Sequence, residues 1–343
     1  MIRRHSSAAA GAAWTALDGV GAPTGYESRI RRAWKRVLRP FGRASAEIAP
    51  TEAFREVRRL ELRTRGLVDS LFSGEFSSVF HGRGLEFSHV RSYQVGDDVR
   101  AIDWKVTARR GTPFVRQFVE ERDLLVALVV DVSGSARHGP GDKSAGEIGH
   151  EIGAALAFAA SRNNDRVALL LVSDRVEHFI PPGSGRKHVI RLLTEMVSHE
   201  PAGRGTDLSV GFDRLSRTLS GRATVFVISD FIQSSPESPF RQALLRLAAV
   251  HDLVAIRLVT AASLELPDVG WIETTDPETG RRVTFDTGRP KVREHYRHSV
   301  LRAQADTAAL LGEVGAELID VDTAADPLAV LSAFFRMRRS APR

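Results

Sequence analysis

The chain has 343 residues, of which 43% are hydrophobic and 26% charged, a length that exceeds one ordinary domain and a composition that excludes a disordered or fibrous protein. The net charge is +6, but residues 1–45 carry +7 and residues 336–343 carry +4, whereas residues 46–335 carry −5. The total charge therefore gives little reason to expect a nucleic-acid partner, because the body of the chain is mildly acidic.

The chain contains no cysteine. This excludes disulfides, zinc sites built from thiolates and a cysteine nucleophile, and it fits a cytoplasmic protein. The longest apolar run spans 124–130 and stops at Asp131, far short of the roughly 18 residues that a membrane helix needs. We therefore expect no integral membrane segment.

Residues 1–119 fall into three segments that differ in composition and periodicity. Residues 1–50 are rich in Ala, Gly, Ser and Arg without sustained periodicity, which predicts a flexible basic leader with a short helix around 29–38. Thr51 is a good N-cap and Glu52 suits a first helical turn, so a helix is predicted from there to Phe72. Residues 74–119 are turn-rich and partly alternating, which indicates a small β-rich subdomain.

From residue 124 onward, continuous apolar segments alternate with amphipathic ones. Strands are predicted at 124–131, 166–173, 224–229, 253–259 and 317–321. Helices are predicted at 147–160, 186–197, 207–219, 239–250, 291–314 and 327–335, and a hairpin at 271–285. This alternation predicts an α/β fold with a doubly wound, mainly parallel sheet flanked by helices.

The predicted organisation has four parts. They are a leader over 1–50, a helix with the β-rich subdomain over 51–122, the sheet domain over 123–336 with a hairpin insertion at 268–288, and a basic tail over 337–343.

Oxygen-bearing side chains follow the ends of the predicted strands, where doubly wound sheets bind their ligands. Asp131, Ser133 and Ser135 follow the first strand, Thr206 precedes a helix, and Asp230 follows a later strand. Two carboxylates and three hydroxyls suit a hard divalent cation, Mg²⁺ or Mn²⁺. Helix capping is the alternative role, since Ser, Thr and Asp are common before helices.

This set of residues resembles the metal-ion-dependent adhesion site of von Willebrand factor type A domains. The resemblance implies that Ser133, Ser135 and Thr206 contact the metal directly. It also implies that Asp131 and Asp230 act mainly through water, and that a partner's carboxylate takes the open coordination position.

The segments that precede Asp131 point to a more specific family. It is similar to the bacterial domain-of-unknown-function family 58 in the segments 74–87, 91–93, 96–100, 102–104, 107–109 and 115–118, and the likeness covers roughly residues 55–335. This resemblance implies a MoxR-type AAA+ ATPase as partner. It also implies an adaptor or chaperone-like role in assembling or activating an unknown client protein.

Charged side chains crowd the segment 91–104, and three roles are open for them. The aspartates could form a second metal site for phosphodiester hydrolysis. They could instead cap a turn and pair with arginines, the role we favour because arginines match aspartates in number. The segment could also be a partner-binding surface with aromatic anchors, consisting of Arg91, Tyr93, Asp97, Asp98, Arg100, Asp103 and Trp104.

A Walker P-loop is missing, since Asp142 stands before Lys143 where glycine is needed, so any ATP chemistry must come from a partner. The sequence therefore predicts a non-enzymatic, metal-dependent protein-interaction module, in which the neighbouring β-rich subdomain adds specificity to metal-bridged docking. The alternative is a metal-dependent hydrolase or nuclease that uses the Asp-rich block at 97–103, or a nucleic-acid binder that uses the leader.

Overall fold

The computed structural model describes residues 50–72, 85–94, 96–120, 124–136, 144–203, 205–232, 239–260, 264–275 and 282–340. The predicted leader and its short helix around 29–38 lie outside these residues, except for Pro50. Within the described residues, no helix is both long enough and apolar enough to cross a membrane.

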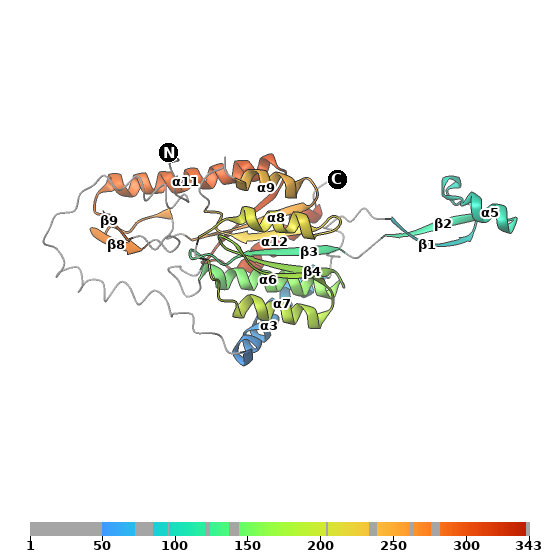
Figure 1. Ribbon diagram of the computed structural model, residues 1–343, viewed down its shortest axis with the longest axis horizontal. Coiled ribbons are helices and arrows are strands. Elements are labelled where there is room, and N and C mark those ends of the chain that lie inside the picture. The colour runs from blue at the N-terminus through green and yellow to red at the C-terminus, as the bar shows by residue number, and fades with distance from the viewer. Residues whose placement is uncertain are drawn as a thin grey trace.

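A six-stranded sheet forms the centre of the molecule (Figure 1). In spatial order its strands are β10 (Glu317–Asp322), β7 (Asp252–Val259), β6 (Thr224–Ser229), β3 (Leu125–Asp131), β4 (Arg166–Val172) and β5 (Val176–Gly183). All neighbours pair in parallel except β4 and β5. β3 and β6 are buried along their whole length, as expected for strands covered on both faces. The predicted doubly wound, mainly parallel sheet is thereby confirmed.

The edge strand β5 has no counterpart among the predicted strands. It pairs with β4 in the antiparallel direction, and most of its residues are exposed or half-buried. Pro181 and Pro182 lie within it. Proline has no N–H to donate, so it is tolerated in a strand only at the edge of a sheet. The two prolines therefore make this segment hard to recognise as a strand from the sequence.

Helices cover both faces of the sheet (Figure 1). One face carries α3 (Pro50–Phe72), α6 (Ala145–Arg162), α7 (Arg186–Ser198) and α12 (Pro327–Ser340), and the other carries α8 (Leu208–Thr218), α9 (Pro239–Ala248) and α11 (Pro290–Glu313). Successive side chains of β3 point to opposite faces, so Leu128 belongs to one core and Val129 to the other.

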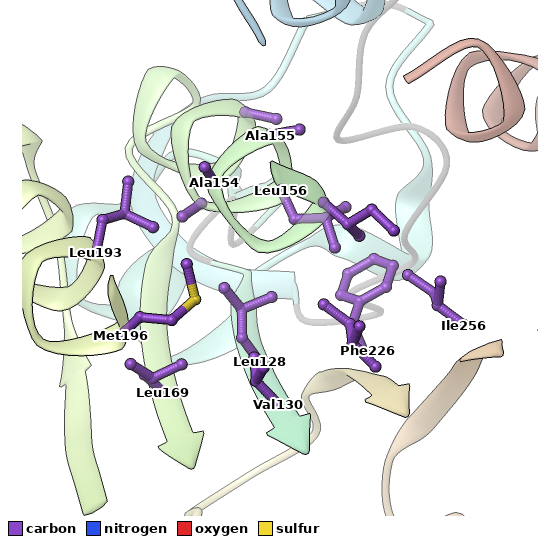
Figure 2. Packing of buried hydrophobic residues seen from close by; sticks show 14 of the residues in the cluster. Leu128, Val130, Ala154, Ala155, Leu156, Leu169, Leu193, Met196, Phe226 and Ile256 are labelled. Atoms are coloured by element: carbon purple, nitrogen blue, oxygen red, sulfur yellow. The ribbon is translucent and has the colours of Figure 1, made fainter. Parts of the chain in front are cut away.

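The larger core lies between the sheet and the helices α6 and α7. Figure 2 shows side chains of these helices pointing onto sheet residues such as Leu128 and Phe226. Helix α6 packs closely because it carries glycine at the contacts. A Cβ atom at Gly153 would lie 3.1 Å from the sulfur of Met196, so the packing there leaves little room for a larger residue.

Helix α3 packs on the sheet domain. Val57 and Leu60 are buried in the same core as α6 and α7. Arg63 also forms a 2.8 Å ion pair with the buried Glu151 of α6. The helix of the predicted segment 51–122 therefore buries its apolar side chains against the sheet domain.

A small unit, which we call the arm, comprises residues 85–94 and 96–120 and extends away from the sheet domain (Figure 1). Its elements are the antiparallel strands β1 (Leu85–Ser92) and β2 (Phe114–Glu120), the short 3₁₀ helix η1 (Val99–Ala101) and the helix α5 (Trp104–Arg110). The β-rich character matches the prediction, whereas α5 adds a helix to it. Since β2 ends at Glu120 and β3 begins at Leu125, the arm joins the amino end of β3.

The predicted hairpin is present as β8 (Trp271–Thr275) and β9 (Arg282–Asp286), which pair in the antiparallel direction. It follows β7 in the chain and therefore lies at the carboxyl end of the parallel strands, away from the arm (Figure 1). Val283 and Phe285 form a small core with Val292 of α11. This insertion is thus held to the sheet domain through α11.

The core assignment predicts a large loss of stability for Leu128→Ala. Leu128 is fully buried, so the loss of its side chain should lower the free energy of unfolding by about 2–5 kcal/mol. Leu245→Ala on α9 is the matched control, because Leu245 is 44% exposed and should cost about 0.5 kcal/mol or less. Urea denaturation measures both, and equal losses would contradict the assignment.

Candidate functional site

The order of the strands places a topological switch point at the carboxyl ends of β3 and β6, and we call this position the crevice. From β3 the chain continues to β4 and β5 on one side, whereas β6, β7 and β10 lie on the other. The loops after β3 and β6 therefore diverge, and such a switch point is where doubly wound folds bind ligands. Asp131 is the last residue of β3, and Asp230 directly follows β6.

Asp131 links the two strand ends. Its side chain is buried, and its Oδ1 atom accepts a hydrogen bond from the backbone N–H of Ser133 at 2.9 Å. Its Oδ2 atom accepts the hydroxyl of Ser229 at 2.6 Å. The Ser229 hydroxyl in turn accepts the N–H of Phe231 at 2.9 Å. Ser229 is absent from the predicted set, although a hydroxyl at the end of a fully buried strand was a signal for it.

Two serines and the second aspartate join this group. The hydroxyls of Ser133 and Ser135 lie 3.1 Å apart, and the Ser135 hydroxyl donates to the carboxylate of Asp230. Asp230 also accepts the N–H of Ile232 at 3.0 Å. Hydrogen bonds therefore connect four of the five predicted residues into one cluster.

The fifth residue, Thr206, lies between α7 and α8. Its neighbour Asp207 donates its N–H to the carbonyl of Ser173 at 2.9 Å, and Ser173 directly follows β4. Thr206 thus lies at the same edge of the sheet, beside the strand next to β3. The capping role falls to Asp207, whose side chain accepts the N–H of Ser209 at the start of α8.

The carboxylate of Asp131 is buried, whereas Asp230 is half-buried beside it. Burial raises the pKa of Asp131, and hydrogen bonds from Ser133 and Ser229 offset this only in part. Burial and then the negative charge of Asp131 raise the pKa of Asp230 to about 6. Each carboxylate therefore makes ionisation of the other more costly, a penalty that a bound cation would relieve.

This set of donors fits a hard divalent cation, which prefers carboxylate and hydroxyl oxygens. Among the described residues, no group of three or more His, Cys, Asp or Glu side chains could hold a metal ion. A cation at the crevice would therefore need the serine and threonine hydroxyls, with water, beside the two carboxylates.

Comparisons with known proteins agree with the resemblance seen in the sequence. Residues 89–306 match the family described as "Protein of unknown function DUF58". The chain belongs to this family. Uncharacterized protein Rv1480 of Mycobacterium tuberculosis H37Rv is 32% identical over 307 residues, which cover 88% of this chain and 95% of that protein.

Two solved structures resemble this DUF58 protein. BatB from Bacteroides thetaiotaomicron has a TM-score of 0.41 at 11% identity and covers 64% of this chain and 100% of that one. A von Willebrand factor type A protein from Catenulispora acidiphila has a TM-score of 0.36 at 10% identity and covers 66% of this chain and 43% of that one. Because both scores are low, the fold of the DUF58 chain rests on its own strand order.

The Asp-rich block of the DUF58 arm forms caps and an ion pair, as favoured from the sequence. Asp97 accepts two hydrogen bonds from the Arg91 guanidinium at 2.7 and 2.8 Å, and this bidentate contact lowers the pKa of Asp97. Asp98 caps η1 and Asp103 caps α5. The three carboxylates therefore bind groups of the arm itself. The arm joins the amino end of β3, whereas the Asp131 cluster lies at the carboxyl end of that strand.

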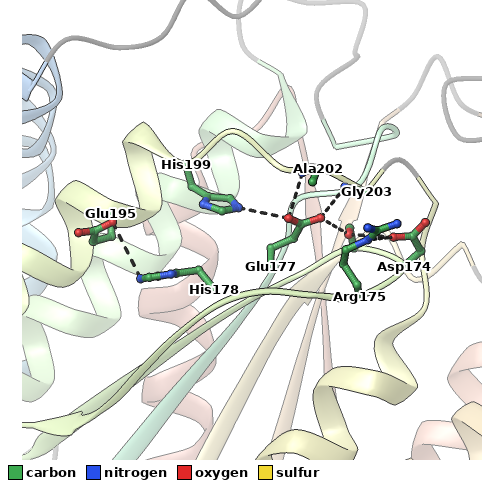
Figure 3. A network of polar contacts seen from close by, with 9 residues as sticks. Asp174, Arg175, Glu177, His178, Glu195, His199, Ala202 and Gly203 are labelled. Carbon is green, nitrogen blue, oxygen red and sulfur yellow. Dashed lines mark hydrogen bonds and ion pairs between the residues drawn. The ribbon is translucent and has the colours of Figure 1, made fainter.

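A second polar network secures the loop that precedes Thr206 (Figure 3). Glu177 lies in β5, and its side chain is only 4% exposed. It accepts the hydroxyl of Ser173 at 2.6 Å and the backbone N–H groups of Gly203 and Ala202 at 2.6 and 3.0 Å. One buried carboxylate thus ties the loop after α7 to the end of β4.

Two histidines, His178 and His199, extend this network (Figure 3). His199 lies 3.5 Å from Glu177, and its ring stacks on that of His178 at a centroid distance of 6.0 Å. Burial alone would raise the pKa of Glu177. Hydrogen bonds from Ser173, Ala202, Gly203 and His199 outweigh that effect and lower its pKa. The stability that Glu177 contributes is therefore complete at neutral pH and is lost as the pH falls through the lowered pKa.

Asp230→Asn tests the electrostatics of the crevice. In metal-free buffer at pH 7.5 the variant should have a melting temperature about 2–6 °C higher, because it removes a carboxylate whose buried, ionised form is unfavourable. The gain should shrink at pH 5, since Asp230, with a pKa of about 6, is then protonated. Asp306→Asn on the exposed face of α11 is the control. A variant less stable than the native chain at pH 7.5 without metal would contradict this account.

Two glycines test the Glu177 network. A Cβ atom at Gly203 would lie 2.2 Å from oxygens of both Ser173 and Asp174, whereas at Gly205 the nearest atom would be 3.5 Å away. Gly203→Ala should therefore displace the loop and raise hydrogen exchange of residues 199–207 by about 10-fold or more. Gly205→Ala should leave exchange unchanged. Equal exchange in both variants, measured by mass spectrometry of the peptides, would refute the close packing.

Proposed function

We propose that this DUF58 protein is a non-enzymatic, divalent-metal-dependent protein-binding module. The metal, Mg²⁺ or Mn²⁺, would be held at the crevice by Asp131, Ser133, Ser135, Thr206 and Asp230. The observation that supports this most directly is the hydrogen-bonded cluster of oxygen side chains at the switch point of the sheet.

Each part of the cluster has a task in this proposal. The bound cation supplies a Lewis-acidic position that accepts a carboxylate from the partner. Asp131 keeps the loops after β3 and β6 together through Ser133 and Ser229. The charges of Asp131 and Asp230 attract the cation, and the serine hydroxyls provide neutral ligands. The Glu177 network holds the loop that carries Thr206.

The partner in this proposal is a MoxR-type AAA+ ATPase, which the chain serves as an adaptor or chaperone-like subunit in the cytoplasm. The support is the family resemblance together with the missing P-loop, which leaves ATP hydrolysis to another protein. The net negative charge of residues 46–335 favours cation binding, and the proposed binding does not require the basic leader.

Binding of Mg²⁺ and of the ATPase can be measured separately. Titration calorimetry with MgCl₂ should show binding to the native chain and a loss of about 10-fold or more in affinity for Asp131→Asn, which keeps a hydrogen-bonding side chain at the strand end but removes its charge. Asp306→Asn should bind as the native chain does, and circular dichroism should confirm that both variants fold.

Binding to the organism's MoxR-type ATPase, measured by surface plasmon resonance, should be strong in Mg²⁺ and weak in EDTA. Metal binding without ATPase binding would remove the proposed partner but leave the metal site. ATPase binding that is unchanged by EDTA and by Asp131→Asn would refute metal-bridged docking.

A further inference from the structure

The arm carries exposed apolar and basic side chains within one short stretch of chain, residues 99–109. Trp104 is 65% exposed and Val99 is 58% exposed. Arg100, Lys105 and Arg109 are also exposed. Lys105 and Arg109 lie four residues apart on α5 and therefore share one side of the helix. We call these five residues the tip face.

The opposite side of α5 is occupied by the arm itself. Phe114 of β2 donates its N–H to the Thr107 hydroxyl at 3.0 Å, and the Arg110 guanidinium lies 5.7 Å from the centre of the Phe114 ring. Val115 beside it is only 5% exposed. The helix is thus fixed to β2 through Thr107 and Arg110, and its three residues of the tip face, Trp104, Lys105 and Arg109, are exposed.

The aspartates of the arm have partners within the arm, whereas the basic side chains of the tip face form no ion pair among the described residues. Asp97 is paired with Arg91, and the side chains of Asp98 and Asp103 accept backbone N–H groups. By contrast, Arg100, Lys105 and Arg109 form no ion pair within the described part of the chain. The acidic groups are thereby used in the arm's own fold, and the basic groups face outward.

The arm is too small to be rigid through its own core. It contains a two-stranded ribbon and a seven-residue helix, and a two-stranded ribbon alone is marginally stable in water. An exposed tryptophan beside arginine is the composition found where protein interfaces concentrate their binding energy. A partner that covered Trp104 would both bury apolar surface and order the arm.

We infer that the tip face is a docking surface for an acidic segment of a partner protein, with an apolar side chain that packs on Trp104. Charge complementarity supports an acidic partner. A protein is favoured over nucleic acid or an anionic membrane because residues 85–120 hold six Lys and Arg against five Asp and Glu. Nucleic acids and anionic membranes bind strongly basic sites. A protein segment needs only a few acidic groups, which can lie opposite Arg100, Lys105 and Arg109.

This inference is independent of the proposed metal site, because the arm joins the amino end of β3 and the Asp131 cluster lies at the carboxyl end. The two surfaces can therefore be tested apart. A contact made by the tip face should persist in EDTA, whereas metal-bridged docking should not.

Site-specific photo-crosslinking tests the docking surface in the full chain. A benzoylphenylalanine placed at Ala108, an exposed position on α5, should yield a discrete protein adduct in cells that naturally make this chain. The crosslinked peptide should be rich in Asp and Glu. The double variant Lys105→Glu with Arg109→Glu should lower the yield by about 10-fold or more, and lysines in place of the partner's acidic residues should restore it.

The matched control reverses Lys187 and Arg191, which are also exposed and four residues apart, on α7. It should leave the adduct unchanged, and Trp104→Ala should reduce it. Three results would overturn the inference: no protein adduct, an adduct that survives reversal of Lys105 and Arg109, or a crosslinked peptide without acidic residues. In purified form, retention on phosphatidylglycerol vesicles or duplex DNA that is lost in the double variant would assign the tip face to that ligand instead.

Discussion

The buried carboxylate of Asp131 is the constraint on which the crevice depends. One of its oxygens binds the N–H of Ser133 and the other binds the hydroxyl of Ser229, so a single side chain fixes the loops that leave β3 and β6. These loops diverge because the chain turns to opposite sides of the sheet after the two strands. A charge held away from water needs such partners, and here one partner lies in the loop after β3 and the other is the last residue of β6.

The oxygen cluster and the arm lie at opposite ends of β3. Its carboxyl end carries the oxygen cluster, and its amino end receives the arm directly from β2. The hairpin of β8 and β9 lies at the end opposite the arm (Figure 1). The proposed metal-dependent surface and the tip face therefore lie at opposite ends of the sheet and do not overlap.

Much of the sheet domain could be predicted from hydrophobic periodicity, because each helix and strand is determined mainly by residues close together in the chain. The strand predicted at 124–131 is β3, and the helix predicted at 186–197 is α7. The grouping of Asp131 with Asp230 could be predicted as well, since parallel strands present their carboxyl ends at one edge. The strand β5 could not, because Pro181 and Pro182 hide an edge strand that depends on β4 for pairing.

The sequence by itself determined the alternating strands and helices, the family and the kinds of oxygen ligand available. Only the tertiary structure decided which polar groups share a space. Asp131 and Ser229 are 98 residues apart in the chain and 2.6 Å apart in the fold, and Glu177 holds a loop 25 and 26 residues further on. Periodicity depends on near neighbours and can be seen in the sequence, whereas these contacts depend on strand order and on the burial that follows from it.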